Sequence, residues 1–240
     1  MTSEREIDEA LRDFGLADED RAAWQRSGLA AEAFEAWLTD RVARRPAGRR
    51  AREVYGAEDV HDFARRAILE ALALGPGDRL LEIGCGGGLL LREALATGAT
   101  VTGIDHSAEM VSLARERAPG ALVRLAGAEQ LPFPEGSFTA VAMSIVLMFL
   151  ADPVAALHEC SRVLARGGRL AVYTTSPELR GTPAAPEPLA SHTYFYGDDD
   201  LVAMARRAGF VNATVANDDG GQLLTAHARS GGVGDSAARG

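Results

Sequence analysis

Residues 80–88 read LLEIGCGGG, an apolar run that stops abruptly in glycines, and this stretch decides the fold. The residues that follow it have the composition of a helix. Glycine lets the backbone turn tightly and approach a ligand closely, and the amino end of a helix offers free N–H groups. The sequence therefore predicts a strand, a glycine loop and a helix that together bind a nucleotide-like ligand.

The spacing of the glycines separates this loop from a dinucleotide-binding loop. The dinucleotide fingerprint G-x-G-x-x-G needs a small residue at a position where this chain has Leu89. Asp105 follows a predicted apolar strand, twenty-one positions after Gly84. A carboxylate at the end of the neighbouring strand can accept both hydroxyl groups of a ribose. Together, the loop and the acid favour ligand binding over a simple tight turn.

Downstream of the loop, predicted strands and helices alternate as parallel strands with crossover helices require. The helix from Pro153 to Leu164 has the clearest ends, because Asp152 suits its N-cap and Gly167-Gly168 suits its end. The predicted strands cover residues 79–83, 100–104, 122–125, 138–144, 169–175, 211–216 and 221–228, and the other predicted helices cover 59–74, 87–97, 108–118 and 198–208.

Upstream of the loop, apolar residues recur at helical spacing from Glu4 to Arg45. We expect a helical extension over residues 1–57, an α/β domain over 58–229 and a disordered tail over 230–240, where Gly, Ser and Ala dominate.

The extension carries an apolar stripe and a cluster of arginines. The stripe must be buried, which predicts a lid over the binding site, with an inert add-on or a dimer contact as the alternative. The arginines surround Pro46 and Gly48, which break the helical pattern, and they favour a linker with a solvated helix end over an anion site. The stripe is Phe34, Trp37, Leu38 and Val42, and the cluster is Arg41, Arg44, Arg45, Arg49, Arg50 and Arg52.

Composition narrows the class of partner. The 240 residues include 25 basic and 34 acidic side chains, a net charge of -9 that repels polyanions, so nucleic acid is not expected as a partner. The two cysteines, Cys85 and Cys160, lie in dissimilar contexts, which predicts no metal site and fits a reducing cytosol. The longest apolar run, residues 140–151, is too short to cross a bilayer. We expect a cytoplasmic monomer or homodimer without membrane association.

The glycine loop resembles motif I of the class I S-adenosylmethionine-dependent methyltransferases. Residues 101–107 are similar to that family's ribose-binding segment, residues 131–138 to its L-P-F turn, and residues 159–168 to its E-x-x-R-V-L-x-x-G-G segment. The similarity is strongest to the ubiquinone, menaquinone and natural-product biosynthesis methyltransferases. It implies an α/β fold with a Rossmann-like seven-stranded mixed sheet of order 3-2-1-4-5-7-6.

The resemblance implies S-adenosylmethionine as the cofactor and S-adenosylhomocysteine as the product. It also implies in-line methyl transfer to an oxygen, nitrogen or carbon atom of a small molecule, in specialised or quinone-like metabolism, with no metal required. Two alternatives remain open: a cyclisation or rearrangement without methyl transfer on the same scaffold, and a non-catalytic partner subunit. The expected cofactor-binding residues are Tyr55, Glu82, Gly84, Cys85, Gly86, Asp105, His106, Met110, Gly127, Ala128, Glu129 and Ser144.

Two positions depart from the family pattern. Gly127 stands where related proteins carry the aspartate that meets the adenine amino group, which leaves the backbone of residues 127–128 or the Glu129 side chain to contact the base. Thr139 stands where the family usually has an aspartate after a phenylalanine, and we expect that change to be structural.

The loop after the fifth predicted strand contains the candidate catalytic residues. Residues 191–196 place one imidazole and two phenols close together, at the carboxyl edge of the sheet where ligands of open α/β folds bind. We expect His192 to act as a general base and Tyr194 to orient the same acceptor group, with an ordinary exposed loop histidine as the alternative. His61 and His227 show no pattern that points to a function.

Overall fold

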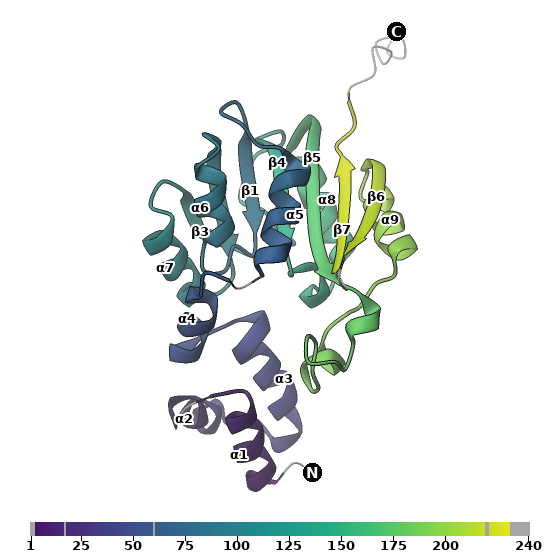
Figure 1. The fold of residues 1–240 in the computed structure, drawn as a ribbon. Helices are drawn as coiled ribbons and strands as arrows, with labels where there is room; N and C mark the ends of the chain where they lie inside the picture. Colours follow the sequence, from purple (N-terminus) through teal and green to yellow (C-terminus); the bar gives the residue numbers. More distant parts are fainter. Residues whose placement is uncertain (1–2, 17, 60, 219–220, 231–240) are drawn as a thin grey trace.

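Seven strands form one mixed sheet in the order β3-β2-β1-β4-β5-β7-β6 in the computed structural model, which describes residues 3–16, 18–59, 61–218 and 221–230 (Figure 1). Parallel pairing joins the first five strands along the chain, whereas the last two are antiparallel. This order confirms the predicted fold class. The strands are β1 (Arg79–Ile83), β2 (Thr100–Asp105), β3 (Leu122–Leu125), β4 (Phe138–Ser144), β5 (Leu164–Thr175), β6 (Val211–Asp218) and β7 (Gly221–His227).

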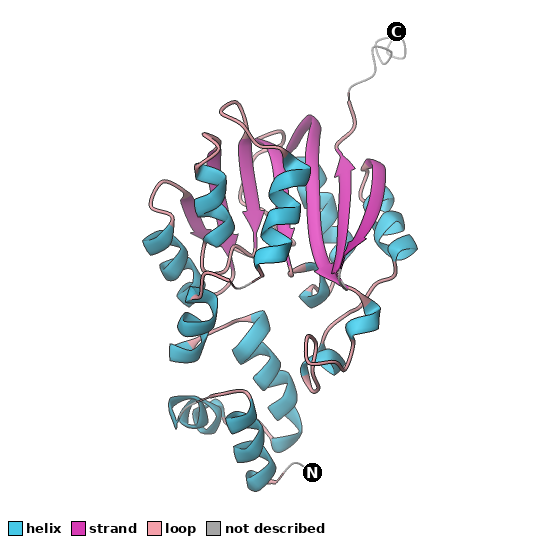
Figure 2. Cartoon of the chain, in the orientation of Figure 1, coloured by secondary structure: helices cyan, strands magenta, loops and turns pink. Residues whose placement is uncertain are grey.

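Helices cover both faces of the sheet, because successive side chains of each strand point to opposite faces (Figure 2). On β1, Leu81 and Ile83 join one buried apolar cluster, whereas Leu80 joins the other. The first cluster is completed by α8 (Pro153–Val163) and α9 (Asp198–Arg207), and the second by α5 (Asp62–Leu72), α6 (Leu89–Leu95) and α7 (Ala108–Arg117).

Both ends of α8 agree with the prediction to within one residue, whereas the strand that follows begins earlier than predicted. Its start is confirmed, since the Asp152 side chain accepts a hydrogen bond from the Ala155 N–H at 2.9 Å. Its end, predicted at Leu164, lies at Val163, but β5 begins at Leu164 rather than at the predicted Arg169. Leu164 pairs with Phe138 of β4 before a shift in register, and this pairing extends the strand to the end of the helix.

The extension contains α1 (Glu4–Asp13), α2 (Asp18–Ser27), α3 (Phe34–Thr39), a π-helical turn (Asp40–Arg44) and α4 (Gly48–Gly56). Figure 1 shows α1, α2 and α3 across from the carboxyl edge of the parallel strands. Phe34 and Leu38 of the apolar stripe pack with Ile7, Leu11 and Trp24 in a separate cluster. The stripe is therefore buried mainly within the extension itself.

Four of the six clustered arginines form ion pairs with acidic side chains of the same chain. Arg41 pairs with the buried Asp20 at 2.6 Å, and Arg52 pairs with Glu109 at 3.0 Å and Glu116 at 2.8 Å. Arg44 pairs with Asp40 at 2.6 Å and Arg49 with Glu53 at 3.6 Å.

The predicted linker is shorter than expected, because α4 begins at Gly48. Arg52 and a hydrogen bond from the Ser107 hydroxyl to the Pro46 carbonyl, at 2.8 Å, attach α4 and the preceding turn to α7. The predicted disordered tail lies outside the described residues beyond Ser230.

Candidate functional site

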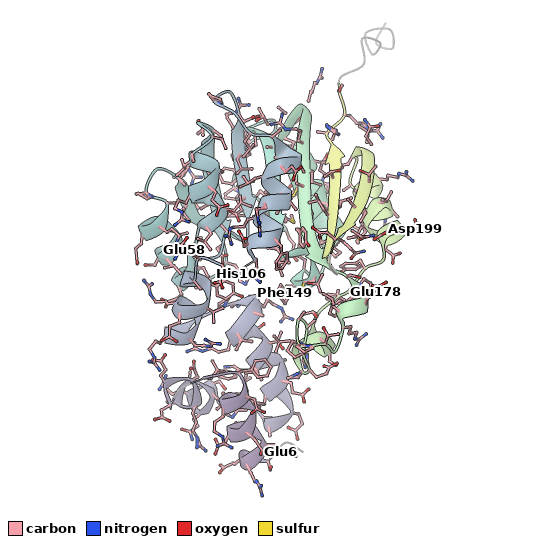
Figure 3. All side chains as sticks on the ribbon, viewed as in Figure 1. Glu6, Glu58, His106, Phe149, Glu178 and Asp199 are labelled. Atoms are coloured by element: carbon pink, nitrogen blue, oxygen red, sulfur yellow. The ribbon has the colours of Figure 1, made fainter. Side chains whose placement is uncertain are left out.

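A cavity of about 570 Å³ lies at the carboxyl edge of the parallel strands. Its volume falls within the range of roughly 300–1,000 Å³ that is usual for small-molecule sites. The glycine loop, the ends of β2 and β4, and the loop after β5 form its walls, and residues 42–46 of the extension close one side. Figure 3 shows His106 and Phe149, two lining residues, between the sheet and the extension.

All twelve predicted cofactor-binding residues line this cavity, although they come from five separate stretches of the chain. The sequence placed them at strand ends and loops, and the parallel sheet brings those ends together. Their contacts with a bound cofactor stay a prediction.

Two glycines of the loop are required for different reasons. Gly84 has φ +69°, and a Cβ there would lie 2.3 Å from Cγ2 of Val146, so the loop after β4 leaves no room for a side chain. Gly86 has φ +48°, but a Cβ there would meet only Cδ1 of Tyr55 at an ordinary 3.6 Å. Gly84 therefore serves packing within the protein, whereas Gly86 keeps the cavity wall open.

Asp105 is held by backbone groups at the mouth of the glycine loop. Its carboxylate accepts hydrogen bonds from the Gly86 N–H at 2.9 Å and the Ser107 N–H at 2.8 Å. Burial raises the pKa of Asp105, and these N–H groups oppose that effect. An ionised carboxylate has about four acceptor sites, so acceptor capacity remains for two hydroxyl groups of a ligand.

Glu82 is a buried acid with an unsatisfied oxygen. Its Oε2 has no hydrogen-bond partner within the described part of the chain, and the residue lines the cavity. Burial, followed by the charge of Asp105, raises the pKa of Glu82 well above its ordinary value. A polar ligand group such as an ammonium would satisfy this oxygen, so the orphaned atom fits the amino-acid end of S-adenosylmethionine.

Tyr55 lies on the other side of the glycine loop, on α4. Its hydroxyl is 3.5 Å from the Val42 carbonyl, a long hydrogen bond. Burial and the charge of Asp105 both raise the pKa of the Tyr55 phenol, so it stays protonated.

The part of the cavity near β3 has room where the family aspartate is missing. A Cβ on Gly127 would meet no atom within 4 Å, and Ala128 and Glu129 line the same wall. Met110 is fully buried and packs with Ala51 and Leu113 beside this wall. The polar groups that a ligand could contact at this wall are backbone groups and the Glu129 side chain.

The two predicted catalytic side chains lie elsewhere. The Nε2 atom of His192 is 3.5 Å from a carboxylate oxygen of Glu35, and the His192 carbonyl accepts a hydrogen bond from Arg44 at 2.8 Å. Tyr194 is 52% exposed and stacks on Tyr196 with ring centroids 6.4 Å apart. Neither His192 nor Tyr194 is among the described residues that line the cavity. Their loop contributes Leu189, Ala190 and Thr193 instead.

His61 lines the cavity, although its sequence showed no functional pattern. It lies just before α5 and has a left-handed backbone with φ +50°. Arg65, one turn later, and Thr175, at the end of β5, also line the cavity. The sequence near these residues contains no motif that predicts their place in the cavity wall. They reach it because α5 packs against β4 and β5.

Two other family segments are structural. The Thr139 hydroxyl accepts a hydrogen bond from the Arg79 N–H at 2.9 Å and donates one to Asp78 at 2.7 Å, so this departure links two strands. Arg162 of the E-x-x-R segment donates to the Phe133 carbonyl at 2.8 Å and thereby holds the L-P-F turn.

Within the described ranges, no three side chains of His, Cys, Asp or Glu gather as metal ligands, and both cysteines are free and buried. No helix among the residues that the structure describes is long and apolar enough to cross a membrane.

Comparison with known proteins points to one family. A family described as a methyltransferase domain matches residues 81–172. The demethylmenaquinone methyltransferase of Mycobacterium sp. (strain KMS) is 41% identical over 111 residues, which cover 46% of this chain and 47% of that protein, so the match spans about half of the relative's length. The demethylmenaquinone methyltransferase of Tropheryma whipplei (strain Twist) is 33% identical over 183 residues, 65% of this chain and 75% of that protein. The solved structure of the cyclase SpnF has a TM-score of 0.61 at 21% identity, covering 72% of this chain and 82% of that one, and shares the fold.

Proposed function

This chain belongs to the class I S-adenosylmethionine-dependent methyltransferases, and on that premise we propose that it transfers a methyl group to an oxygen, nitrogen or carbon nucleophile of a small molecule. One observation supports the proposal above the others. A single cavity joins the glycine loop and Asp105, which suit the cofactor, to a largely apolar region that suits an acceptor.

The chain's own residues would hold the cofactor in three places. Asp105 accepts hydrogen bonds from the ribose hydroxyls, Gly86 lets the backbone approach closely, and Glu82 meets the amino-acid end. S-adenosylmethionine, when bound, supplies a methyl group on a positively charged sulfur. Because methyl transfer is an in-line displacement, the protein contributes chiefly by orienting the acceptor and excluding water. Residues 42–46 line one side of the cavity, which supports a role for the extension in excluding solvent.

The acceptor side of the cavity is apolar. Its wall includes Val146, Met148, Phe149, Pro186 and Leu189. Such a wall supports a ring-shaped, weakly polar acceptor, in line with the quinone precursors named for the relatives above. We place the enzyme in quinone-like or specialised metabolism.

A second candidate reaction uses the same scaffold without methyl transfer. The fold shared with the cyclase SpnF supports this alternative, because it shows that the architecture also serves a cyclisation. In that case the cofactor would act only as a bound charge that orients the substrate.

Two measurements test the proposal. Calorimetry should show binding of S-adenosylmethionine and S-adenosylhomocysteine, and radiolabelled S-adenosylmethionine should label an acceptor from a panel of quinols, phenols and aryl amines. Product formation that continues when S-adenosylhomocysteine replaces the donor would instead indicate the cyclisation. Absence of donor binding would contradict both reactions and leave a non-catalytic subunit.

We also propose that the protein acts in the cytoplasm as a monomer or homodimer. The net charge of -9 supports a small-molecule acceptor over nucleic acid, since the overall field repels a phosphate backbone.

A further inference from the structure

His61 occupies a strained position in the cavity wall. Its backbone is left-handed at φ +50°, a conformation that is unfavourable for a residue with a Cβ. Its ring packs edge-on against Tyr55 and Phe63, with centroids 6.4 Å and 6.3 Å away. Strained residues of this kind persist where the surrounding structure holds them, and they concentrate at functional sites.

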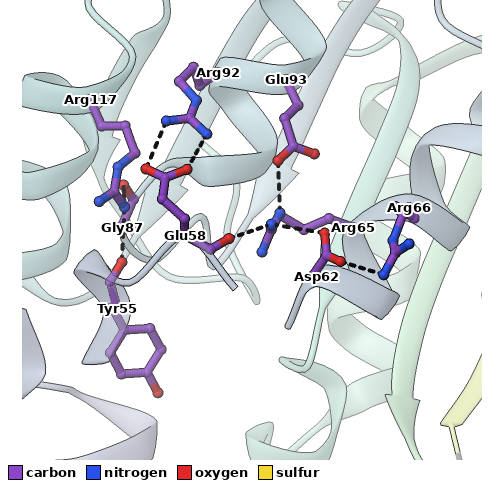
Figure 4. A network of polar contacts seen from close by, with 9 residues as sticks. All are labelled: Tyr55, Glu58, Asp62, Arg65, Arg66, Gly87, Arg92, Glu93 and Arg117. Atoms are coloured by element: carbon purple, nitrogen blue, oxygen red, sulfur yellow. Dashed lines mark hydrogen bonds and ion pairs between the residues drawn. The ribbon is translucent and has the colours of Figure 1, made fainter. Parts of the chain in front are cut away.

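The charges around His61 keep its imidazole neutral. Arg65, on the next turn of α5, is buried and donates to Glu93 at 3.1 Å and to Asp62 at 3.2 Å (Figure 4). Burial, followed by the positive charge of Arg65, lowers the pKa of His61 below its ordinary value. No acidic side chain among the described residues forms an ion pair with His61 to offset this.

Several other titratable groups that line the cavity already hold their protons. Burial raises the pKa of Tyr55, Glu82 and Cys85, so these groups stay protonated. Asp105 accepts two backbone hydrogen bonds, and His106 follows it directly at the expected ribose end. His61 lines the same cavity as Glu82, Arg65 and Thr175, and its imidazole is the group there that is both neutral and able to accept a proton.

We propose that His61 accepts the proton of the acceptor nucleophile and that the acceptor is a largely apolar molecule with a hydroxyl group of the phenol or quinol type. This inference rests on the proposed methyl transfer. A neutral amine already has a reactive lone pair, whereas a hydroxyl gains most from an adjacent base. The apolar wall of Ile145, Val146 and Phe149 fits the rest of such a molecule.

The atoms balance as follows. The acceptor oxygen forms a bond to the methyl carbon while the carbon–sulfur bond breaks, and its electron pair stays on the sulfur. The O–H proton passes to the free ring nitrogen of His61 and then to solvent. The products are a methyl ether, S-adenosylhomocysteine and one proton.

The first test needs no catalysis. NMR titration of the cofactor-free protein, with the His61 signals assigned from a His61→Gln variant, should show an imidazole that is neutral at pH 7 and titrates below about 6.5, the ordinary histidine value. Adding 2-naphthol with S-adenosylhomocysteine should shift these signals. A His61 that titrates at or above the ordinary value, or that does not respond to 2-naphthol, would overturn the proposal.

The second test separates catalysis from binding. With 2-naphthol as acceptor, His61→Gln should lower kcat by about 10²–10⁴-fold, as expected for loss of a general base. The rate of the variant should recover as pH approaches the pKa of the naphthol itself. The Kd for S-adenosylmethionine should change less than about threefold, and transfer to 2-naphthylamine should fall far less. His158→Gln, on the exposed surface of α8, is the matched control and should match the wild type.

Two outcomes would count against His61 in the kinetic test. A loss confined to the Kd for S-adenosylmethionine would make it a cofactor contact, and a loss in His192→Gln but not in His61→Gln would return the base role to the loop after β5. If the wild type binds the donor yet methylates no acceptor, the proposed methyl transfer fails, while the NMR response to 2-naphthol still decides whether His61 faces the acceptor.

Discussion

At the scale of single residues, two carboxyl groups in the cavity wall differ in their surroundings. Asp105 accepts two backbone hydrogen bonds that favour its ionised form. Glu82 has an oxygen without a partner, and the charge of Asp105 disfavours its ionisation further. Such a contrast gives one acid the role of a hydrogen-bond acceptor and leaves the other protonated in the ligand-free protein.

The Asp105→Ala substitution tests the first role. Removing charge-assisted hydrogen bonds to two hydroxyl groups should weaken donor binding by about 1–3 kcal/mol, or roughly 5- to 150-fold in Kd. Calorimetry with S-adenosylhomocysteine measures the effect. Asp199→Ala, which removes an exposed carboxylate on α9, is the matched control and should bind normally. Equal affinities for the two variants would remove Asp105 from the cofactor site.

The Glu82→Gln substitution tests the second role through pH. The folded pKa of Glu82 is raised, so the folded protein holds a proton that the unfolded chain releases above about pH 4.5. This group therefore contributes stability that is present at low pH and lost as pH rises, by up to about 1.4 kcal/mol per pH unit. Denaturant unfolding between pH 5 and 7 should show a flatter pH dependence for the variant. Parallel curves for variant and wild type would contradict this protonation state.

At the scale of elements, the glycine loop combines a packing requirement with a binding requirement. Gly84 contacts Val146 after β4, and Gly86 faces Tyr55 of α4 across ordinary van der Waals distance. The same short loop therefore connects the sheet to the extension. Substituting Gly84 and Gly86 one at a time should therefore separate the effect on stability from the effect on donor binding.

Gly84→Ala should lower the free energy of unfolding, because its Cβ would lie 2.3 Å from Cγ2 of Val146. Gly86→Ala should melt closer to the wild type and lose donor affinity, since its cost is mainly the positive φ. Thermal melts and calorimetry on both variants measure the difference. Val146→Ala combined with Gly84→Ala should recover part of the stability, and no recovery would show that the clash is not the cause.

At the scale of the whole molecule, the first helices of the extension pack among themselves, whereas its later part meets the α/β domain. Ile7, Trp24, Phe34 and Leu38 form one apolar cluster, and residues 42–46 together with Tyr55 line the cavity. The pairs Arg44 to the His192 carbonyl and Glu35 to His192 join the extension to the loop after β5. Two segments far apart in the chain thus meet over the cavity.

Deletion of residues 1–45 tests the lid. The apolar cluster of α1, α2 and α3 is removed as a unit, so the α/β domain should stay folded and should still bind the donor. Methyl transfer should fall strongly, because residues 42–45 no longer exclude water from the acceptor. Circular dichroism, calorimetry and radiolabel transfer follow the three properties. Full transfer by the truncated protein would support the inert add-on instead.

Much of the site could be predicted from sequence because its signals are local. The strand before Gly84, the N-cap at Asp152 and the acid at Asp105 can each be predicted from a few neighbouring residues. Local backbone preference and the spacing of apolar residues are properties of such short stretches. The order of the sheet followed from the family resemblance, and parallel pairing then brings the strand ends to one edge.

Other features depended on contacts between distant segments. The fifth strand begins at Leu164 rather than at Arg169 because Leu164 pairs with Phe138, and the His192 side chain lies near Glu35 because α3 packs against its loop. His61 lines the cavity because α5 packs on β5, and the sequence near residue 61 does not predict this packing. By itself, the sequence determined which segments form strands and where the glycine loop and Asp105 lie. Only the tertiary structure decided which other side chains line the cavity, because direction into a cavity depends on the packing of elements that are far apart in the chain.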